Sequence, residues 1–261
     1  YELEELIAMI FAKLKSLAEQ FLGHNQPIYD VTITVPVSFE EKERLLIKDA
    51  AKIAGFNENI SFIREPVAAI VAYNSAANKN QEKIFIFDLG GSHLGLSIYS
   101  IEDGIFEPVI TTQYEVGGRD FDHKIMEYCI DDLKKNRNID IKEDIKAMKR
   151  LVHHCEKAKI DLSFSIQTQI EIDSLYEGED YQCTITKPKF EDLSSDLFHK
   201  IISYIDETLQ KSGLKMQQLS QVILAGSATK IPRVTEIVTN YFKGIKIHNK
   251  IDPEQVGVYG A

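Results

Sequence analysis

Three short apolar stretches, joined by glycine-containing turns, limit this chain to folds in which consecutive strands lie side by side in one sheet. We expect these strands over 83–88, 94–101 and 105–112. The first turn holds Gly90 and Gly91, and the second is an Asp-Gly pair, which is a strong signal for a tight hairpin. A helical pattern opens at Gly117. Hairpins followed by a helix indicate a sheet with helices packed against it.

The rest of the chain alternates between helical and strand patterns. Apolar residues at helical spacing predict helices over 3–21, 40–54, 65–77, 139–163, 189–212 and 232–242. Strands are expected over 30–36, 60–63 and 221–226, with a hairpin formed by 167–178 and 179–186. A last short helix is expected to open at Pro253, with Asp252 as its cap. Together these patterns predict an α/β protein with a mixed sheet.

Charge and cysteine content narrow the function classes. The formal net charge of −10 argues against nucleic acid as the main partner. No apolar run approaches the roughly 18 residues that span a bilayer, so no membrane partner is expected. Cys129, Cys155 and Cys183 do not form a zinc or disulfide pattern, and we interpret them as buried thiols of a cytoplasmic protein. The chain begins inside a helical pattern and reads as an excerpt, so the missing signal peptide carries little weight.

Three glycine-bearing turns point to chemistry. They are Gly90-Gly91 after a strand, Gly117-Gly118 before a helix and Gly226-Ser227 between a strand and a helix. Glycine lets backbone amides approach an anion closely, and a helix N-terminus adds a favourable dipole. Two of the turns lie beside Asp88 and Asp120. A plain hairpin turn is the alternative for any one of them, but three together predict a nucleotide phosphate with a hydrated divalent metal ion.

Several segments of the chain, taken in order, resemble one known protein family. The segments "VTITVP", "REPVAAIVAY", "FDLGG", "GGRDFD", "CEKAK", "EIDSLYEG" and "AGSATKIP" occur in this order. They resemble the nucleotide-binding domain of the 70-kilodalton heat-shock chaperones, which have the actin-like, ribonuclease-H-like ATPase fold. The resemblance covers essentially the whole chain and implies roughly the last two thirds of that domain. It implies a partial first lobe over 1–77, a second-lobe base over 78–117 and 196–261, and an outer subdomain over 118–195.

The resemblance also implies roles for single residues. Glu65 and Asp88 would act on a magnesium ion through water and serve catalysis. The amides of the second phosphate loop would hold phosphate, and two further segments would grip the adenosine of ATP or ADP. The residues implied as nucleotide ligands are Gly90, Gly91, Ser92, Gly117, Gly118, Glu156, Lys159, Ser163, Gly226, Ser227 and Lys230.

The chain departs from the family pattern at several of these positions. His93 replaces a threonine, and Gly95 replaces an acidic residue that helps to place cations. Ile160 and Lys230 replace two arginines that stack on adenine, and lysine has no planar guanidinium face. The first phosphate loop and the catalytic lysine would lie before Tyr1. These departures predict a divergent member whose nucleotide-binding domain lacks its N-terminal part.

Two functions remain open from the sequence, beside the plainer alternative of a domain that has kept only the fold and binds no nucleotide. One is an atypical chaperone domain that binds ATP or ADP with weak or no hydrolysis and acts as a regulatory partner in protein folding. The other is an ordinary ATP-hydrolysing chaperone domain when complete. The resemblance implies a stress-response role and, as partners, a J-domain co-chaperone and a nucleotide-exchange factor. The stretch "LGGSHLGLS" resembles the corresponding loop of cytosolic members that pair with a J-domain protein at the ribosome.

Overall fold

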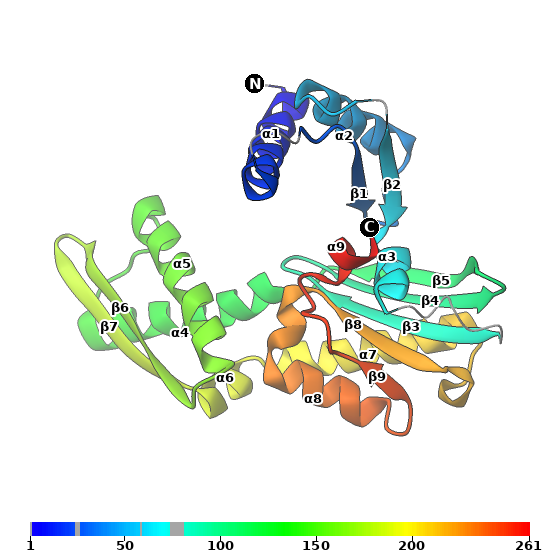
Figure 1. Cartoon of the computed structure of the whole chain (residues 1–261). Helices are drawn as coiled ribbons and strands as arrows, with labels where there is room; N and C mark the ends of the chain where they lie inside the picture. Colours follow the sequence, from blue (N-terminus) through cyan, green and yellow to red (C-terminus); the bar gives the residue numbers. More distant parts are fainter. Residues whose placement is uncertain (1, 24–26, 58, 74–80) are drawn as a thin grey trace. The chain divides into compact units, whose positions relative to one another are not determined.

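The structure, a computed structural model, describes residues 2–23, 27–57, 59–73 and 81–261. It divides into two compact units, residues 1–77 with 255–261 and residues 78–254 (Figure 1). Residues 255–261 are expected in the second lobe from the sequence, whereas the structure groups this segment with the first unit. The reason is close packing, because any Cβ on Gly260 would collide with the backbone of Ala68. The rest of the division into lobes stays a prediction.

The first unit combines a small parallel sheet with helices. Its described elements are α1 (Leu3–Leu22), β1 (Val31–Val35), α2 (Glu41–Ile53), β2 (Ile60–Arg64), α3 (Glu65–Ala72) and α9 (Val256–Gly260). Strands β1 and β2 are parallel neighbours, and α9 packs on α3. The helices and strands predicted before residue 73 are confirmed; the end of the helix predicted over 65–77 lies outside the described residues.

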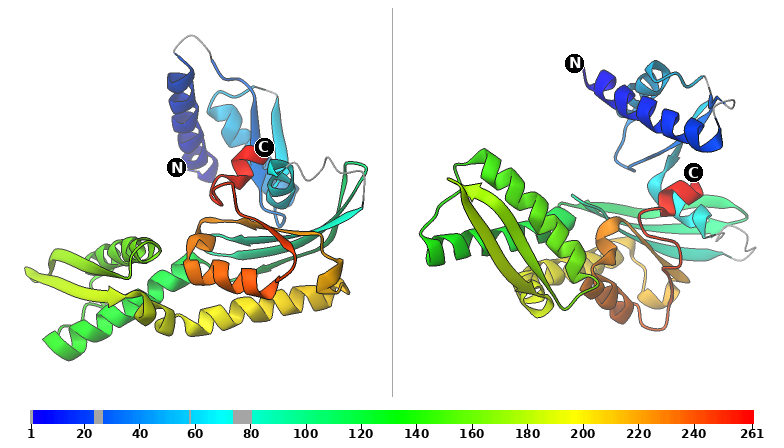
Figure 2. Two further views of the ribbon diagram at one scale, coloured as in Figure 1. Left: turned by 60° about the horizontal axis from the view of Figure 1, so that its bottom comes forward. Right: turned by 60° about the vertical axis from the view of Figure 1, so that its left-hand side comes forward.

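The second unit is built around a five-stranded mixed sheet. Its strands are β3 (Glu82–Leu89), β4 (Leu94–Glu102), β5 (Ile105–Tyr114), β8 (Gln221–Ala225) and β9 (Lys246–His248), in the order β5-β4-β3-β8-β9. The first three are antiparallel, as their short turns require, while β8 and β9 run parallel to β3. Helices α7 (Ser195–Ser212) and α8 (Pro232–Tyr241) lie together along one side of this sheet (Figures 1 and 2). The predicted mixed sheet is therefore confirmed.

The outer part of the second unit is a layer of helices against a hairpin. It consists of α4 (Gly118–Arg137), α5 (Ile145–Leu162), β6 (Gln167–Tyr176), β7 (Glu179–Thr186) and α6 (Lys187–Leu193). Its apolar side chains join those of the sheet in one continuous core. Cys129, Cys155 and Cys183 are buried free thiols in this core, as predicted. Within the described residues, no helix combines the length and apolar character needed to cross a bilayer.

Four local predictions differ from the structure. The helix expected over 139–163 opens only at Ile145, with Asp144 as its N-cap. The single helix expected over 189–212 is broken at Ser194, which is fully buried and ends α6 where α7 begins. The three-residue strand β9 was not expected, since it is too short to show a periodic pattern. The last helix opens after Gln255 rather than at Pro253, because the Pro253 carbonyl accepts a hydrogen bond from Gly226 N and belongs to a turn.

Candidate functional site

The first two glycine turns meet in the structure. The β3–β4 turn docks on the start of α4, where Gly118 N donates to Gly90 O at 2.9 Å and Arg119 N donates to Gly91 O at 2.8 Å. Gly117 has no room for a side chain, because a Cβ there would lie 2.6 Å from the Gly91 carbonyl and from Ser92 N. The sequence places glycine where two backbone segments touch.

This docking decides which backbone amides are free to bind an anion. Gly90 N donates to His93 O at 3.0 Å and closes its own turn. Gly117 N donates to Asp120 Oδ2 at 2.7 Å, so Asp120 caps the helix and does not face a metal ion through that oxygen. Among the described residues, the amides of Gly91 and Ser92 have no acceptor. These two amides are therefore the available anion donors of the loop.

The third turn is packed against Asp88. Gly226 has φ +83°, a conformation that side chains rarely adopt, and a Cβ there would lie 2.5 Å from Asp88 Oδ1. Glycine lets β8 pass this close to the end of β3, and the third predicted turn thus joins the other two.

The Asp88 carboxyl itself is poised for a cation. Burial raises its pKa to about 6, and no described residue donates a hydrogen bond to it. Asp88 is partly buried, and a carboxylate in such a place is stabilised by a metal ion or by the waters that magnesium keeps. Gly95 lies opposite Asp88 across the β3–β4 ladder, and a Cβ on Gly95 would lie 3.8 Å from Asp88 Cβ. Asp88 therefore fits the predicted metal role without an acidic neighbour on β4.

A cavity of about 370 Å³ opens beside these turns, entirely within the second unit. It is lined by Gly91, Gly118, Arg119, Asp122, Glu156, Lys159, Ile160, Ser163, Phe164, Ser227, Ala228, Lys230, Ile231 and Glu254. Seven predicted ligand residues are among them. The other four, Gly90, Ser92, Gly117 and Gly226, lie next to lining residues in the chain. Glu65 belongs to the other unit, so its meeting with Asp88 stays a prediction.

Lys159 and Asp122, which both line this cavity, form a buried ion pair. Lys159 Nζ lies 2.8 Å from Asp122 Oδ1 and donates to Gly118 O at 3.0 Å. Burial raises the pKa of Asp122, and Lys159 opposes this effect. Asp122 is not among the predicted site residues, although it stands in the quoted "GGRDFD" segment. The pair ties α5 to the beginning of α4 and so fixes two walls of the cavity.

The opposite wall holds a second charged group. Lys230 Nζ lies 2.8 Å from Asp252 Oδ1 and 3.2 Å from Glu254 Oε2, and these carboxylates raise the pKa of Lys230. Glu254 lines the cavity but was not predicted as a site residue. The ammonium group is thus engaged by two acids at the rim.

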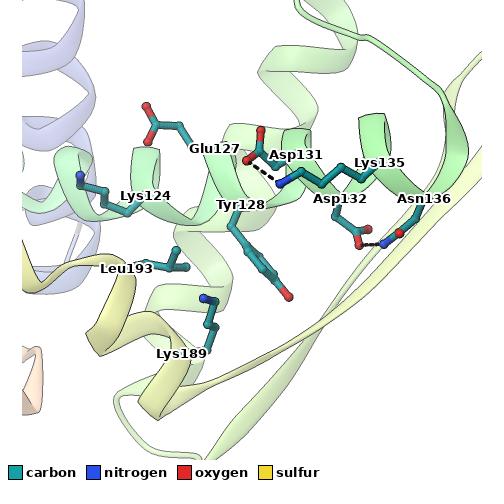
Figure 3. A pocket seen from close by; sticks show the side chains of 9 residues that line it. All are labelled: Lys124, Glu127, Tyr128, Asp131, Asp132, Lys135, Asn136, Lys189 and Leu193. Carbon is teal, nitrogen blue, oxygen red and sulfur yellow. Dashed lines mark hydrogen bonds and ion pairs between the residues drawn. The ribbon is translucent and has the colours of Figure 1, made fainter.

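A larger cavity of about 570 Å³ lies between α4 and α6 (Figure 3). Its lining is Lys124, Glu127, Tyr128, Asp131, Asp132, Lys135, Asn136, Lys189 and Leu193. Its lysines are already paired, in Lys124–Asp196 at 3.1 Å, Lys135–Asp131 at 3.5 Å and Lys189–Asp192 at 3.3 Å. This cavity offers an anion no unpaired lysine. Among the described residues, no group of three or more His, Cys, Asp or Glu side chains is arranged to hold a metal ion directly.

Comparison with known proteins agrees with the motifs. The family model described as Hsp70 protein matches residues 1–261. A curated relative, heat shock cognate 70 kDa protein 3 of Dictyostelium discoideum, is 37% identical over 262 residues, which cover 99% of this chain and 41% of the relative. The chain thus spans less than half the length of that relative. It belongs to the Hsp70 chaperone family and carries nucleotide-binding domain sequence of the actin-like ATPase fold.

Proposed function

We propose that this chain binds ADP or ATP in the cavity between α5 and the Gly226–Lys230 turn, with weak or no hydrolysis, and acts as a regulatory partner in protein folding. The observation that carries the proposal is the convergence of four separate segments on one cavity. Gly91, Gly118, Lys159 and Ser227 each come from a different segment and line the same space. Members of the family generally bind ATP or ADP with Mg²⁺, which suits this arrangement.

The chemistry of the cavity supports a nucleotide. Gly91 lines the cavity and brings a free backbone amide toward it. Glu156 and Ser163 add side-chain oxygens for hydroxyl groups. Its volume of about 370 Å³ is that of a small-molecule site. Bound Mg²⁺ would supply positive charge facing the phosphates, and Asp88 would hold it through water.

We expect weak turnover because two charged groups are missing, at Gly95 and at Ile160. Phosphoryl transfer depends on positioned charges around the phosphates. Gly95 gives no carboxylate opposite Asp88, and Ile160 gives no cation to stack on the base. Loss of one stacking cation corresponds to about 2- to 30-fold weaker affinity. This loss, combined with the missing carboxylate at Gly95, leads us to expect micromolar rather than nanomolar binding.

The runner-up function is ordinary ATP hydrolysis by the complete domain. What favours it is the buried, unpartnered Asp88 carboxyl beside three intact glycine turns. Under this alternative Glu65 would complete the catalytic pair with Asp88. The two functions differ in the fate of bound ATP, and not in where it binds.

The proposed biological setting follows the family. Hsp70 proteins generally work with J-domain proteins and nucleotide-exchange factors. We propose the same two classes of partner for the protein that contains this chain. A cytoplasmic location, a role in the stress response and association with the ribosome are further parts of this proposal.

Calorimetry with Mg-ADP tests the binding step. The chain should bind with a micromolar dissociation constant. Glu156→Gln should weaken binding about 5- to 20-fold, because a charge-assisted hydrogen bond to a hydroxyl is lost. Glu127→Gln is the matched control, since Glu127 lines the other cavity. Absence of binding, or an equal effect of both changes, would contradict the proposed site, and nanomolar affinity would contradict the weak-binding part.

A further inference from the structure

The nucleotide cavity has an apolar side that the established parts of the site do not use. Ile160 and Phe164 line the cavity at the end of α5, and their side chains are 51% and 84% exposed. Phe164 makes no aromatic or cation contact with any other described residue. An exposed phenyl ring in a cavity wall is apolar surface that a ligand can cover.

The position of Phe164 is set by the turn that ends α5. Glu156 and Ile160 are four residues apart on α5 and share one side of the helix, whereas Phe164 lies two residues beyond Leu162, where its amide donates to Asp161 O at 3.0 Å. All three line the cavity. This wall of the cavity thus offers both a carboxylate and an aromatic ring.

Among the described lining residues, Lys230 in the Gly226–Lys230 turn is not free for stacking. Lys230 is held by Asp252 at 2.8 Å and Glu254 at 3.2 Å. An ammonium group engaged by two carboxylates has little attraction left for the face of a ring. Arg119 lines the cavity at the start of α4, so the α5 side is the wall that offers a base an aromatic ring.

We propose that Phe164 is the base-stacking residue of this site, with Ile160 beside it, and that the ring selects purine nucleotides by stacking area. This inference rests on the proposed nucleotide function. Aromatic stacking accepts any flat base, so adenine and guanine bind comparably, while the smaller pyrimidines overlap less with the ring. The contact takes the place of the cation that is absent at Ile160.

A protein-docking patch is the competing explanation for the exposed ring. Ile166, which is 81% exposed, would extend such a patch two residues further along the chain. However, Ile166 does not line the cavity, whereas Phe164 does. This difference favours a ligand inside the cavity and supplies a matched control.

The test is calorimetry of the 261-residue chain with ADP, GDP and CDP in the presence of Mg²⁺. Phe164→Ala and Phe164→Leu should weaken ADP and GDP binding about 5- to 100-fold, as expected for the loss of one stacked base. Phe164→Tyr keeps the ring and should bind like the unchanged chain, and so should Ile166→Ala. CDP should bind more weakly than ADP to the unchanged chain and lose less in Phe164→Ala.

The outcomes separate this inference from the proposed function. If the unchanged chain binds ADP and both ring-removing variants bind it equally well, the stacking role is wrong and the nucleotide function stands. Equal losses in Phe164→Ala and Ile166→Ala would also overturn the stacking role, in favour of a general surface effect. If the unchanged chain binds none of the three nucleotides, both proposals fall. Thermal unfolding verifies that each variant is folded.

Discussion

Lys159 Nζ lies 2.8 Å from Asp122 Oδ1, and the two side chains are only 12% and 7% exposed. Charges removed from water in this way stabilise a fold only while both partners are present. The pair joins the last turn of α5 to the beginning of α4 beside the cavity proposed to hold the nucleotide. It therefore links the stability of the second unit to the shape of its site.

Removing one partner of this pair should be costly. Lys159→Ala should lower the free energy of unfolding by about 3–5 kcal/mol, because Asp122 is left charged and buried. Lys211→Ala breaks the exposed pair with Glu207 and should change stability little. The double variant Lys159→Met with Asp122→Asn should recover most of the loss. Urea unfolding measures all three; similar losses in Lys159→Ala and Lys211→Ala would contradict the account.

The Gly226 turn should not accept a side chain. Gly226→Ala adds a Cβ that strikes the Leu89 carbonyl and Asp88, and it keeps an unfavourable positive φ. We expect a loss of at least about 3 kcal/mol and of nucleotide binding. Gly244→Ala is the control, since it has φ +93° but nothing within 4 Å, and should cost about 1–2 kcal/mol. Equal losses in thermal or urea unfolding would show that the close approach at Gly226 is unimportant.

The buried Asp88 carboxyl should make stability depend on pH. Its pKa is raised from 3.8 to about 6 in the folded chain, so the folded state binds more protons between these values. Stability should therefore fall as pH rises from about 4 to about 6, by an order of 2–3 kcal/mol, and then stay level. Asp88→Asn should remove this loss, being more stable than the unchanged chain at about pH 7.5 and equal to it near about pH 3.5. Parallel pH profiles for the two proteins would contradict burial as the cause.

The same substitution should separate stability from function. Asp88→Asn should lose the Mg²⁺ dependence of ADP binding while gaining stability, because the group that disfavours the fold is the one that holds the cation. Calorimetry with and without Mg²⁺ measures this. If the Asp88→Asn variant keeps the full Mg²⁺ effect, Asp88 does not belong to the metal site.

An acidic residue at Gly95 should strengthen the metal site. A Cβ there meets Asp88 Cβ at an ordinary 3.8 Å, so a side chain fits. Gly95→Asp should raise the affinity for Mg-ADP about 3- to 10-fold, since a second carboxylate attracts the hydrated cation. It should also lower stability without Mg²⁺ through like-charge repulsion. Gly95→Asn, which is similar in size and uncharged, should do neither, and the same effect from both would exclude a charge-based explanation.

The sequence predicted the parts of the fold whose patterns are local. The strands around Gly90-Gly91 and the Asp-Gly turn were expected because turn chemistry and alternating apolar residues agree there. The break at Ser194 was missed, since the helical pattern continues through it and its burial depends on the tertiary fold. Strand β9 was missed because it is defined by pairing with β8.

The site was predictable to a similar degree. The glycine turns and the α5 residues lie in quoted segments, and Gly91, Gly118 and Lys159 line one cavity; their role as ligands stays a prediction. The sequence did not show which amides are already used; only the docking of Gly118 on Gly90 reveals that. Phe164 could have been noticed as an aromatic residue directly after Ser163, a predicted ligand.

The fate of bound ATP tests the central claim most directly. The chain is mixed in excess with labelled Mg-ATP, the bound nucleotide is isolated over time, and the fractions present as ATP and ADP are measured, alongside Glu65→Ala as a control. The account predicts that label is bound and stays ATP in both proteins. Conversion to ADP in the unchanged chain but not in Glu65→Ala would contradict the claim of binding without turnover, and absence of bound label would contradict nucleotide binding itself.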